Sequence, residues 1–396
     1  MGGLFLMNLD AQVAAIDRAA LTGPVRSVLG SDTAEIETWR PALLYGGLGV
    51  ALGISAVYRV TGAARDGGTT KPWSLVLKVL RVPTHGPASS GASADGWDRE
   101  VQVYRSGLLD DLPAGLVAAR CYGIEERPGA AWLWLEDVVD EIGPHWPIAR
   151  FALAARHLGR LSGLYLTERP LPDDPWLLLH GLLLSRAAVA AGFWDGLERV
   201  RDDPLARRIW PGDLSDRALR LWHERDWVMA AIECLPQSFV HGDADRRNLF
   251  ARRGAAGEEE TVAIDWALAG VLPLGAELPL LVTASVLWAQ EVRPGDLGEL
   301  ADSCLAGYVA GLADVGWHGD PQLVEAGFAA TAALRHGPLW GAVELVGFTP
   351  EQRAPIMRTM GGSIEEFADR WAAVQRFAYD RLDAVRGVLE AACPPP

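Results

Sequence analysis

Apolar residues in the first third of the chain follow the pattern of strands. Short alternating or continuous apolar runs occur at 42–47, 55–60 and 73–80, and glycine-rich turns separate them. Side chains of a strand point alternately to its two faces, so this period of two predicts an antiparallel meander. Residues 131–138 have the same character. They predict an edge strand that runs into a connector.

Helical spacing dominates the rest of the sequence. Residues 98–109 begin with acidic side chains and place Val101, Tyr104 and Leu108 three or four positions apart, which predicts a helix. Further helices are predicted at 151–166, 214–232, 275–291, 297–312, 322–346 and 364–389. Residues 1–40 have weak periodicity and are interpreted as a leader helix or arm. Residues 84–96, rich in Gly, Ser, Ala and Pro, are interpreted as a flexible loop.

These elements predict an α+β fold with two lobes. Residues 1–137 form a β-rich N-terminal lobe with one key helix, and residues 138–396 form a larger, mainly helical C-terminal lobe. The most apolar stretch, 267–289, contains Glu277, Pro273 and Pro279. Charge and proline in this stretch favour a buried segment over a membrane span.

Composition restricts the partners of the protein. The 396 residues are 49% hydrophobic, enough for a sizeable core, and the formal net charge is −15. This charge argues against binding to nucleic acid or to an anionic membrane. It would attract a cationic acceptor, although solubility alone also explains it.

The cysteines and the start of the sequence indicate a reducing, cytoplasmic location. The four cysteines, at 121, 234, 304 and 393, form no C-x-x-C pair, which indicates neither a zinc site nor a disulfide framework. The first ten residues lack the basic region and the longer apolar run of a signal peptide.

Lysine is rare in this chain. Only Lys71 and Lys78 occur among the 36 basic residues that are lysine or arginine. A lysine retained in an arginine-rich background indicates a role that arginine cannot fill.

Two segments carry the strongest chemical signal. Residues 239–250 read FVHGDADRRNLF, and residues 262–266 read VAIDW. Phosphoryl transfer needs a carboxylate that takes the acceptor's proton and metal ions that neutralise the phosphates. Asp243, on a loop after an apolar strand, suits the base. Asn248 and Asp265 offer oxygen ligands of the kind that Mg²⁺ prefers.

This pair of segments resembles the aminoglycoside phosphotransferase and choline-kinase-like branch of the protein-kinase-like superfamily. That family has the motif H-G-D-x-x-x-x-N followed by I-D, which His241, Gly242, Asp243 and Asn248 match, together with Ile264-Asp265. The resemblance implies that Asp243 is the catalytic base or orients the acceptor. It also implies that Asn248 and Asp265 bind Mg²⁺ and that His241 braces the loop. Taken singly, such aspartates more often close turns or cap helices.

The upstream residues fit the same plan. Lys78 in the third strand and Glu100 in the following helix have the order of a lysine that binds nucleotide phosphates and a carboxylate that orients it. Taken alone they equally fit an exposed strand lysine and a helix N-terminal glutamate.

Two more segments are assigned to the nucleotide. Gly46, Gly47 and Gly49, with Ser55 behind them, lie where a phosphate-covering loop belongs, although an ordinary hairpin would also use such glycines. The LWLED sequence at 133–137 resembles the family's L-x-x-E-D connector, whose backbone meets the adenine edge. It assigns Glu136 and Val138 to nucleotide binding, and the alternative is a purely structural role for the side chains there.

The sequence departs from the family pattern at two places. Asp245, Arg246 and Arg247 replace the histidine or proline found in many members. Arg247 either stabilises charge on the transferring phosphoryl group or forms a surface salt bridge. Glu277 occupies the position of an aspartate that supports the catalytic loop in the family.

We therefore expect a kinase that uses ATP, or alternatively GTP, with Mg²⁺ and phosphorylates a hydroxyl of a small molecule such as an antibiotic, an amino sugar or a natural-product intermediate. A peptide-directed Ser/Thr kinase of a biosynthetic pathway and a non-catalytic nucleotide-binding scaffold are the alternatives. Intact Lys78, Asp243, Asn248 and Asp265 argue against the scaffold.

Overall fold

The structure is a computed structural model that describes residues 12–44, 55–82, 96–179, 200, 202–287, 291–336, 346–360 and 362–393. The chain divides into two compact units. Unit 1 consists of Met1–Asp111 and Ala118–Val139, and unit 2 consists of Leu112–Val117 and Asp140–Pro396. The α+β fold class is confirmed, with an antiparallel sheet in unit 1 and mostly helices in unit 2.

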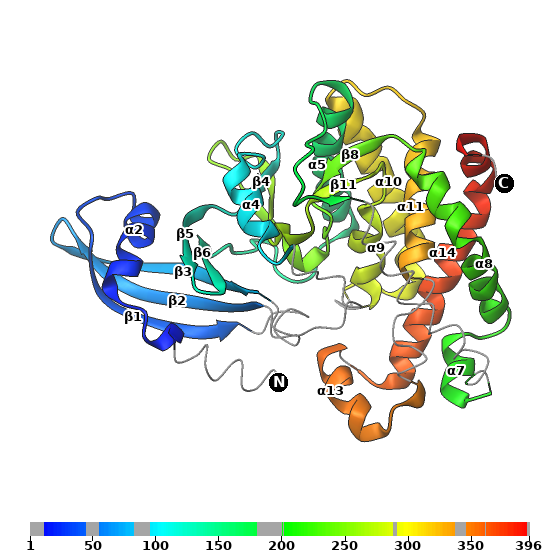
Figure 1. The fold of residues 1–396 in the computed structure, drawn as a ribbon, viewed down its shortest axis with the longest axis horizontal. Coiled ribbons are helices and arrows are strands. Elements are labelled where there is room, and N and C mark those ends of the chain that lie inside the picture. The colour runs from blue at the N-terminus through cyan, green and yellow to red at the C-terminus, as the bar shows by residue number, and fades with distance from the viewer. Residues whose placement is uncertain are drawn as a thin grey trace. The chain divides into compact units, whose positions relative to one another are not determined.

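Unit 1 is built on a five-stranded antiparallel sheet of order β1-β2-β3-β6-β5 (Figure 1). Its strands are β1 (Glu35–Leu44), β2 (Ser55–Asp66), β3 (Thr69–Arg81), β5 (Cys121–Arg127) and β6 (Ala130–Glu136). The prediction that 131–138 forms an edge strand is wrong, because β5 pairs with its outer side. Residues 121–127 have too many charged side chains to stand out as a strand, as expected where an edge strand is partly solvated.

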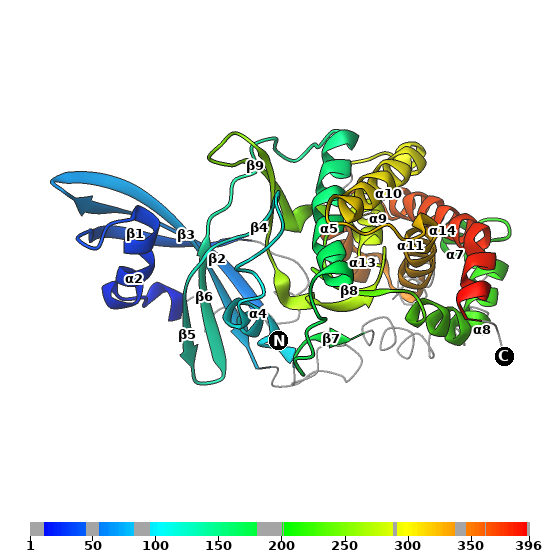
Figure 2. The same cartoon turned by 90° about the horizontal axis from the view of Figure 1, so that it is seen from above.

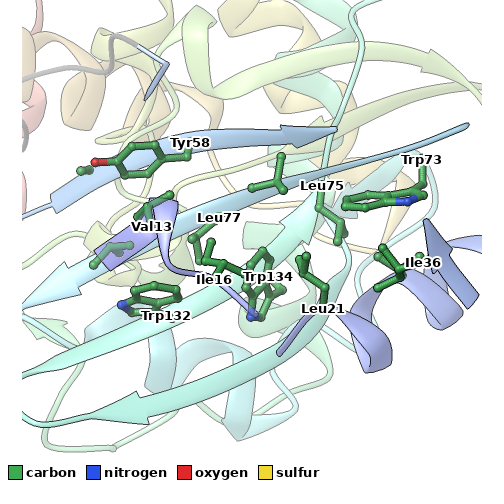
Figure 3. Close-up of a cluster of buried hydrophobic side chains, with 14 of the residues drawn as sticks. Val13, Ile16, Leu21, Ile36, Tyr58, Trp73, Leu75, Leu77, Trp132 and Trp134 are labelled. Atoms are coloured by element: carbon green, nitrogen blue, oxygen red, sulfur yellow. The ribbon is translucent and has the colours of Figure 1, made fainter. Parts of the chain in front are cut away.

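One face of this sheet carries the main core of unit 1. Helix α2 (Arg18–Leu29) packs there, with Asp17 accepting a hydrogen bond from the Ala20 N–H at its start. Figure 3 shows Leu21 of this helix beside Leu75, Leu77 and Trp134 of the sheet. Part of the predicted leader at 1–40 is therefore a helix that covers one face of the sheet. The last residues of the predicted leader, from Glu35, already belong to strand β1.

The opposite face of the sheet packs with helix α4 (Arg99–Ser106). Along β3, Leu75, Leu77 and Val79 belong to the α2 face, while Leu80 packs with Val101 of α4. Strand alternation therefore puts Lys78 on the α4 face together with Leu80.

Unit 2 contains two small sheets and a set of helices. The sheets have the orders β4-β10-β9 and β7-β11-β8. Their strands are β4 (Leu116–Ala118, of which the last residue is assigned to unit 1), β7 (Leu178–Leu179), β8 (Gln237–Val240), β9 (Leu249–Arg253), β10 (Glu259–Ala263) and β11 (Gly270–Pro273). The described helices are α5 (Ile148–Thr167), α7 (Pro204–Ile209), α8 (Leu214–Glu233), α9 (Leu278–Leu287), α10 (Leu297–Asp314), α11 (Pro321–His336), α13 (Pro350–Met360) and α14 (Ile364–Ala392).

Helices α5 and α10 approach each other closely, as both cartoon views show (Figures 1 and 2). A Cβ atom added to Gly159 of α5 would collide with the backbone of Tyr308, and one added to Gly311 of α10 would collide with the Arg156 carbonyl. Glycine at these positions lets the two backbones touch. The contact fixes α5, which carries Ser162 beneath the site described below.

Helix α14 is the longest described helix and packs against α7, α8, α9 and α11. Ser363 and Glu366 form a capping box at its start. Among the described residues, no helix combines the length and the apolar character needed to cross a bilayer.

Candidate active site

A hairpin in unit 2 brings Asn248 and Asp265 together. Strands β9 and β10 are antiparallel, and Leu249 at the start of β9 pairs with Ala263 at the end of β10. Asn248 precedes this pair on one strand, and Asp265 follows it on the other. The Ile264 N–H donates to the Asn248 carbonyl oxygen at 2.9 Å, which extends the ladder to the two predicted metal ligands.

The loop after β8 carries Asp243 to the same place. Gly242 has φ 77°, and a Cβ atom there would collide with the Leu268 carbonyl, so only glycine fits. The Asn248 amide nitrogen donates to both the backbone oxygen and the Oδ2 of Asp243, each at 3.0 Å. The turn from Asp243 to Asn248 is therefore closed by a hydrogen bond between the side chains of two predicted site residues.

His241 joins this loop to the segment that carries Asp265. Its Nδ1 accepts from the Asp243 N–H at 3.2 Å, so the ring proton belongs on Nε2, which donates to the Ile264 carbonyl at 2.8 Å. The buried ring packs edge-on against Trp266, with the ring centroids 4.5 Å apart. This neutral tautomer fixes the spacing between Asp243 and Asp265.

Asp265 has an unusual backbone conformation. Among the described residues it is the only one other than glycine with a positive φ, which is 60°. A non-glycine residue in this region is strained by roughly 1–3 kcal/mol, and such strain concentrates at functional sites. No sequence pattern predicted this conformation.

The donor chemistry of this corner fits a magnesium ion. The Asn248 amide nitrogen donates to Asp243, which leaves its oxygen as the coordinating atom, and Asp265 supplies a carboxylate. The described residues contain no group of three or more His, Cys, Asp or Glu side chains arranged to hold a metal. Magnesium typically takes one or two protein carboxylates and completes its shell with phosphates and water. The residues therefore suit an ion bound together with a nucleotide.

Glu277 lies beneath the loop and is fully buried. It accepts hydrogen bonds from the His241 backbone N–H and, at 3.4 Å, from the Ser162 hydroxyl, which in turn accepts from Tyr308 at 2.7 Å. Burial raises the pKa of Glu277 to about 8, partly offset by these hydrogen bonds. The longer glutamate side chain thus reaches the loop at the position where the family resemblance implies a supporting aspartate.

Arg246 fixes the loop from the other side, which the sequence did not indicate. Its buried guanidinium donates at 2.7 Å to both the Asp140 carboxylate and the Gly143 carbonyl. It stacks on Trp146 with 3.8 Å between the guanidinium carbon and the ring centroid. Its Nε lies 3.3 Å from Glu291, whose pKa burial raises to about 7.

Two other arginines lie near the loop. Arg247 makes two hydrogen bonds of 2.9 Å to Asp245, and its side chain is 60% exposed. Its predicted action on the phosphoryl group stays a prediction, and the salt bridge that was its alternative is present. Arg335 of α11, not singled out in the sequence, has a guanidinium nitrogen 3.9 Å from Asp243 Oδ1.

In unit 1 the predicted nucleotide pair is in contact. Lys78 Nζ lies 2.5 Å from Glu100 Oε2, and both residues are buried. The contact follows from strand alternation, which points Lys78 at α4, and from the position of Glu100 in the first turn of that helix. The roles of the pair toward a nucleotide stay predictions.

The other predicted nucleotide residues are described only in part. Gly46, Gly47 and Gly49 lie outside the described residues, and Ser55 begins β2 opposite Leu80. Glu136 ends β6, and its carboxylate accepts from the Arg120 N–H at 3.1 Å, while Val138 is half-buried.

Comparison with known proteins gives the class of fold. No family model and no curated protein matches the sequence. Among solved structures, choline kinase from Cryptosporidium parvum Iowa II matches with a TM-score of 0.50 and 11% identity, over 96% of this chain and 98% of that one. The chain therefore has the protein-kinase-like fold that the resemblance implied.

Two other solved structures are similar over most of their length. An aminoglycoside phosphotransferase from Alicyclobacillus acidocaldarius has a TM-score of 0.49 and 16% identity, covering 92% of this chain and 96% of that one. Amicoumacin kinase hAmiN, in complex with AMP-PNP, Ca²⁺ and Ami, has a TM-score of 0.47 and 16% identity, covering 86% and 91%.

Proposed function

We propose that this protein is a small-molecule kinase that transfers the γ-phosphoryl group of Mg·ATP to a hydroxyl of its acceptor. The observation that carries the proposal is the corner of unit 2 where Asp243, Asn248 and Asp265 meet at the end of the β9–β10 hairpin. The protein-kinase-like fold supports it. A nucleotide-binding scaffold has no need for a base and two oxygen ligands held together.

In the proposed reaction Asp243 accepts the proton of the acceptor hydroxyl. The acceptor oxygen forms a bond to the γ-phosphorus, the bond from that phosphorus to the bridging oxygen breaks, and the electron pair leaves with ADP. Asn248 orients the Asp243 carboxylate through its hydrogen bond to Oδ2. His241 and Glu277 keep the loop backbone in place, so that little rearrangement is needed during transfer.

Asn248 and Asp265 would hold the magnesium ion that accompanies the nucleotide. A bound magnesium ion supplies charge neutralisation of the phosphates. Lys78 would bind the phosphates directly, and Glu100 orients its ammonium group through the buried ion pair. Each of these residues therefore has a separate and measurable role.

Mass-spectrometric detection of phosphate transfer tests this proposal. Wild-type protein and Asp243→Asn are incubated with Mg·ATP and a panel of aminoglycosides, macrolides, amino sugars, choline and Ser/Thr peptides. We expect Asp243→Asn to lower kcat by about 100-fold or more, as loss of a general base does. Its affinity for Mg·ATP, measured by calorimetry, should stay close to that of the wild type.

Asp265→Ala gives the complementary result. It should weaken magnesium-dependent nucleotide binding by about tenfold or more, the range found when groups around a metal are removed. Asp226→Asn, at an 81% exposed side chain on α8, is the matched control for Asp243→Asn and should behave as wild type.

Wild-type activity in Asp243→Asn would rule out the assigned base. Product formed only from the peptides would favour the peptide-directed kinase.

A further inference from the structure

The two carboxylate oxygens of Asp243 face different groups. Oδ2 accepts a hydrogen bond from the Asn248 amide at 3.0 Å, whereas Oδ1 faces the Arg335 guanidinium at 3.9 Å. A direct N–H···O hydrogen bond is shorter, about 2.7–3.2 Å. Arg335 therefore faces the oxygen of the proposed base without forming a direct hydrogen bond to it.

Arg335 comes from a firmly held element. Its side chain is only 11% exposed, and it lies in the last turn of α11. The α11 backbone touches the segment that leads to Glu277, because a Cβ atom on Gly327 would collide with the Leu274 carbonyl and one on Gly275 would collide with the Val324 carbonyl. The helix that positions Arg335 thus packs against the segment that supports the catalytic loop.

The arginine suggested by the sequence is placed differently. Both the Nε and a terminal nitrogen of Arg247 bind Asp245, within its own turn. Arg335 is less exposed than Arg247, with 11% against 60% of the side chain accessible. A more enclosed guanidinium interacts more strongly with charge that develops beside it, because less water screens the interaction.

We propose that Arg335 contacts the transferred phosphoryl group, an inference that rests on the proposed kinase function. As the acceptor oxygen bonds to phosphorus and gives its proton to Asp243, negative charge lies on the equatorial phosphoryl oxygens. The planar guanidinium donates hydrogen bonds to those oxygens. Arg335 is then a catalytic residue supplied from outside both sequence motifs.

The test compares Arg335→Gln and Arg335→Lys with wild type. Three quantities are measured: the kcat of transfer to the acceptor found in the panel, the rate of Mg·ATP hydrolysis with water as acceptor, and the affinity for Mg·AMP-PNP. We expect Arg335→Gln to lower both rates by about 100-fold, as loss of one charge-stabilising donor does. The affinity for Mg·AMP-PNP should change by less than about twofold, because an interaction made only in the transition state does not contribute to binding of the ground-state nucleotide.

Arg335→Lys keeps the charge but loses the forked geometry, so we expect a loss of about tenfold, between the other two proteins. Arg293→Gln, at an 85% exposed arginine, is the control and should match wild type. If Arg335→Gln does not fold, Arg335→Lys decides, and an unchanged kcat contradicts the inference.

The outcomes separate this inference from the function on which it rests. Unchanged rates in Arg335→Gln, with an active wild type, overturn the role of Arg335 and leave the kinase proposal standing. A wild type that binds Mg·AMP-PNP yet neither transfers nor hydrolyses overturns both. A weakened nucleotide affinity with an unchanged kcat would make Arg335 a binding residue and also contradict the inference.

Discussion

Asp265 and Glu277 show how single residues in this protein depart from their ordinary preferences. Asp265 has a backbone conformation that favours glycine, and Glu277 is a carboxyl group without access to solvent. The I-D motif placed Asp265 in the predicted site, and the family resemblance implied that Glu277 supports the loop, but neither predicted the backbone strain or the burial. Strain and desolvation depend on the surrounding structure, which a one-dimensional pattern does not contain.

The pKa of Glu277 leads to a prediction for stability. Burial raises it in the folded protein to about 8, above the ordinary value of 4.5. Between these two values the folded state keeps a proton that the unfolded state has lost. Stability therefore falls as the pH rises, by about 1.4 kcal/mol per pH unit for this group.

Glu277→Gln removes this titration and retains an acceptor for the His241 N–H. The free energy of unfolding of both proteins is measured in urea at about pH 5 and about pH 8. Between these two pH values the wild type should lose several kcal/mol more than the variant, because only the wild type has a carboxyl group with a raised pKa at this position. Parallel curves for the two proteins would show that Glu277 does not titrate in this range.

At the scale of elements, the sequence predicted those with a strong period and missed those without one. The predicted helix at 297–312 corresponds to α10, which ends two residues later at Asp314. The predicted strand at 73–80 lies within β3. The short strand β8 before Asp243 was predicted, but β9, which directly follows the motif, was not. Such short strands form through pairing partners that are distant in the sequence, and propensity alone does not reveal them.

The close contact between α5 and α10 predicts that Gly311 of α10 cannot be replaced without a loss of stability. Gly311→Ala should lower the free energy of unfolding by about 1–3 kcal/mol, because the added methyl group collides with the Arg156 carbonyl. This loss should appear although alanine favours a helix by about 1 kcal/mol.

Gly387 of α14 is the matched control. A Cβ atom there meets nothing within 4 Å, so Gly387→Ala should raise stability by about 0.5–1 kcal/mol. Thermal and urea unfolding of both variants would check the pair. A stabilising Gly311→Ala would mean that the two helices are not in close contact.

For the whole molecule, the pattern of apolar residues predicted an α+β chain with a β-rich first part. They did not predict that Leu112–Val117 belongs to unit 2, where the Gly115 carbonyl accepts from the Thr261 N–H. Nor did they indicate Arg335, which lies on a helix well beyond both motifs. Only tertiary structure brings such residues to the site, and helical periodicity makes an arginine near a helix end look like ordinary surface.

The scarcity of lysine makes the Lys78–Glu100 pair easy to follow by chemical labelling. The chain has two side-chain amines, Lys71 with a 45% exposed side chain and Lys78 buried against Glu100. An amine-reactive reagent should therefore modify the native protein at Lys71 well before Lys78. Glu100→Gln should accelerate modification of Lys78 alone, and peptide mass spectrometry would measure both sites in one experiment. With Lys71 as an internal reference, the reactivity of Lys78 measures how much of the time the Lys78–Glu100 ion pair is formed.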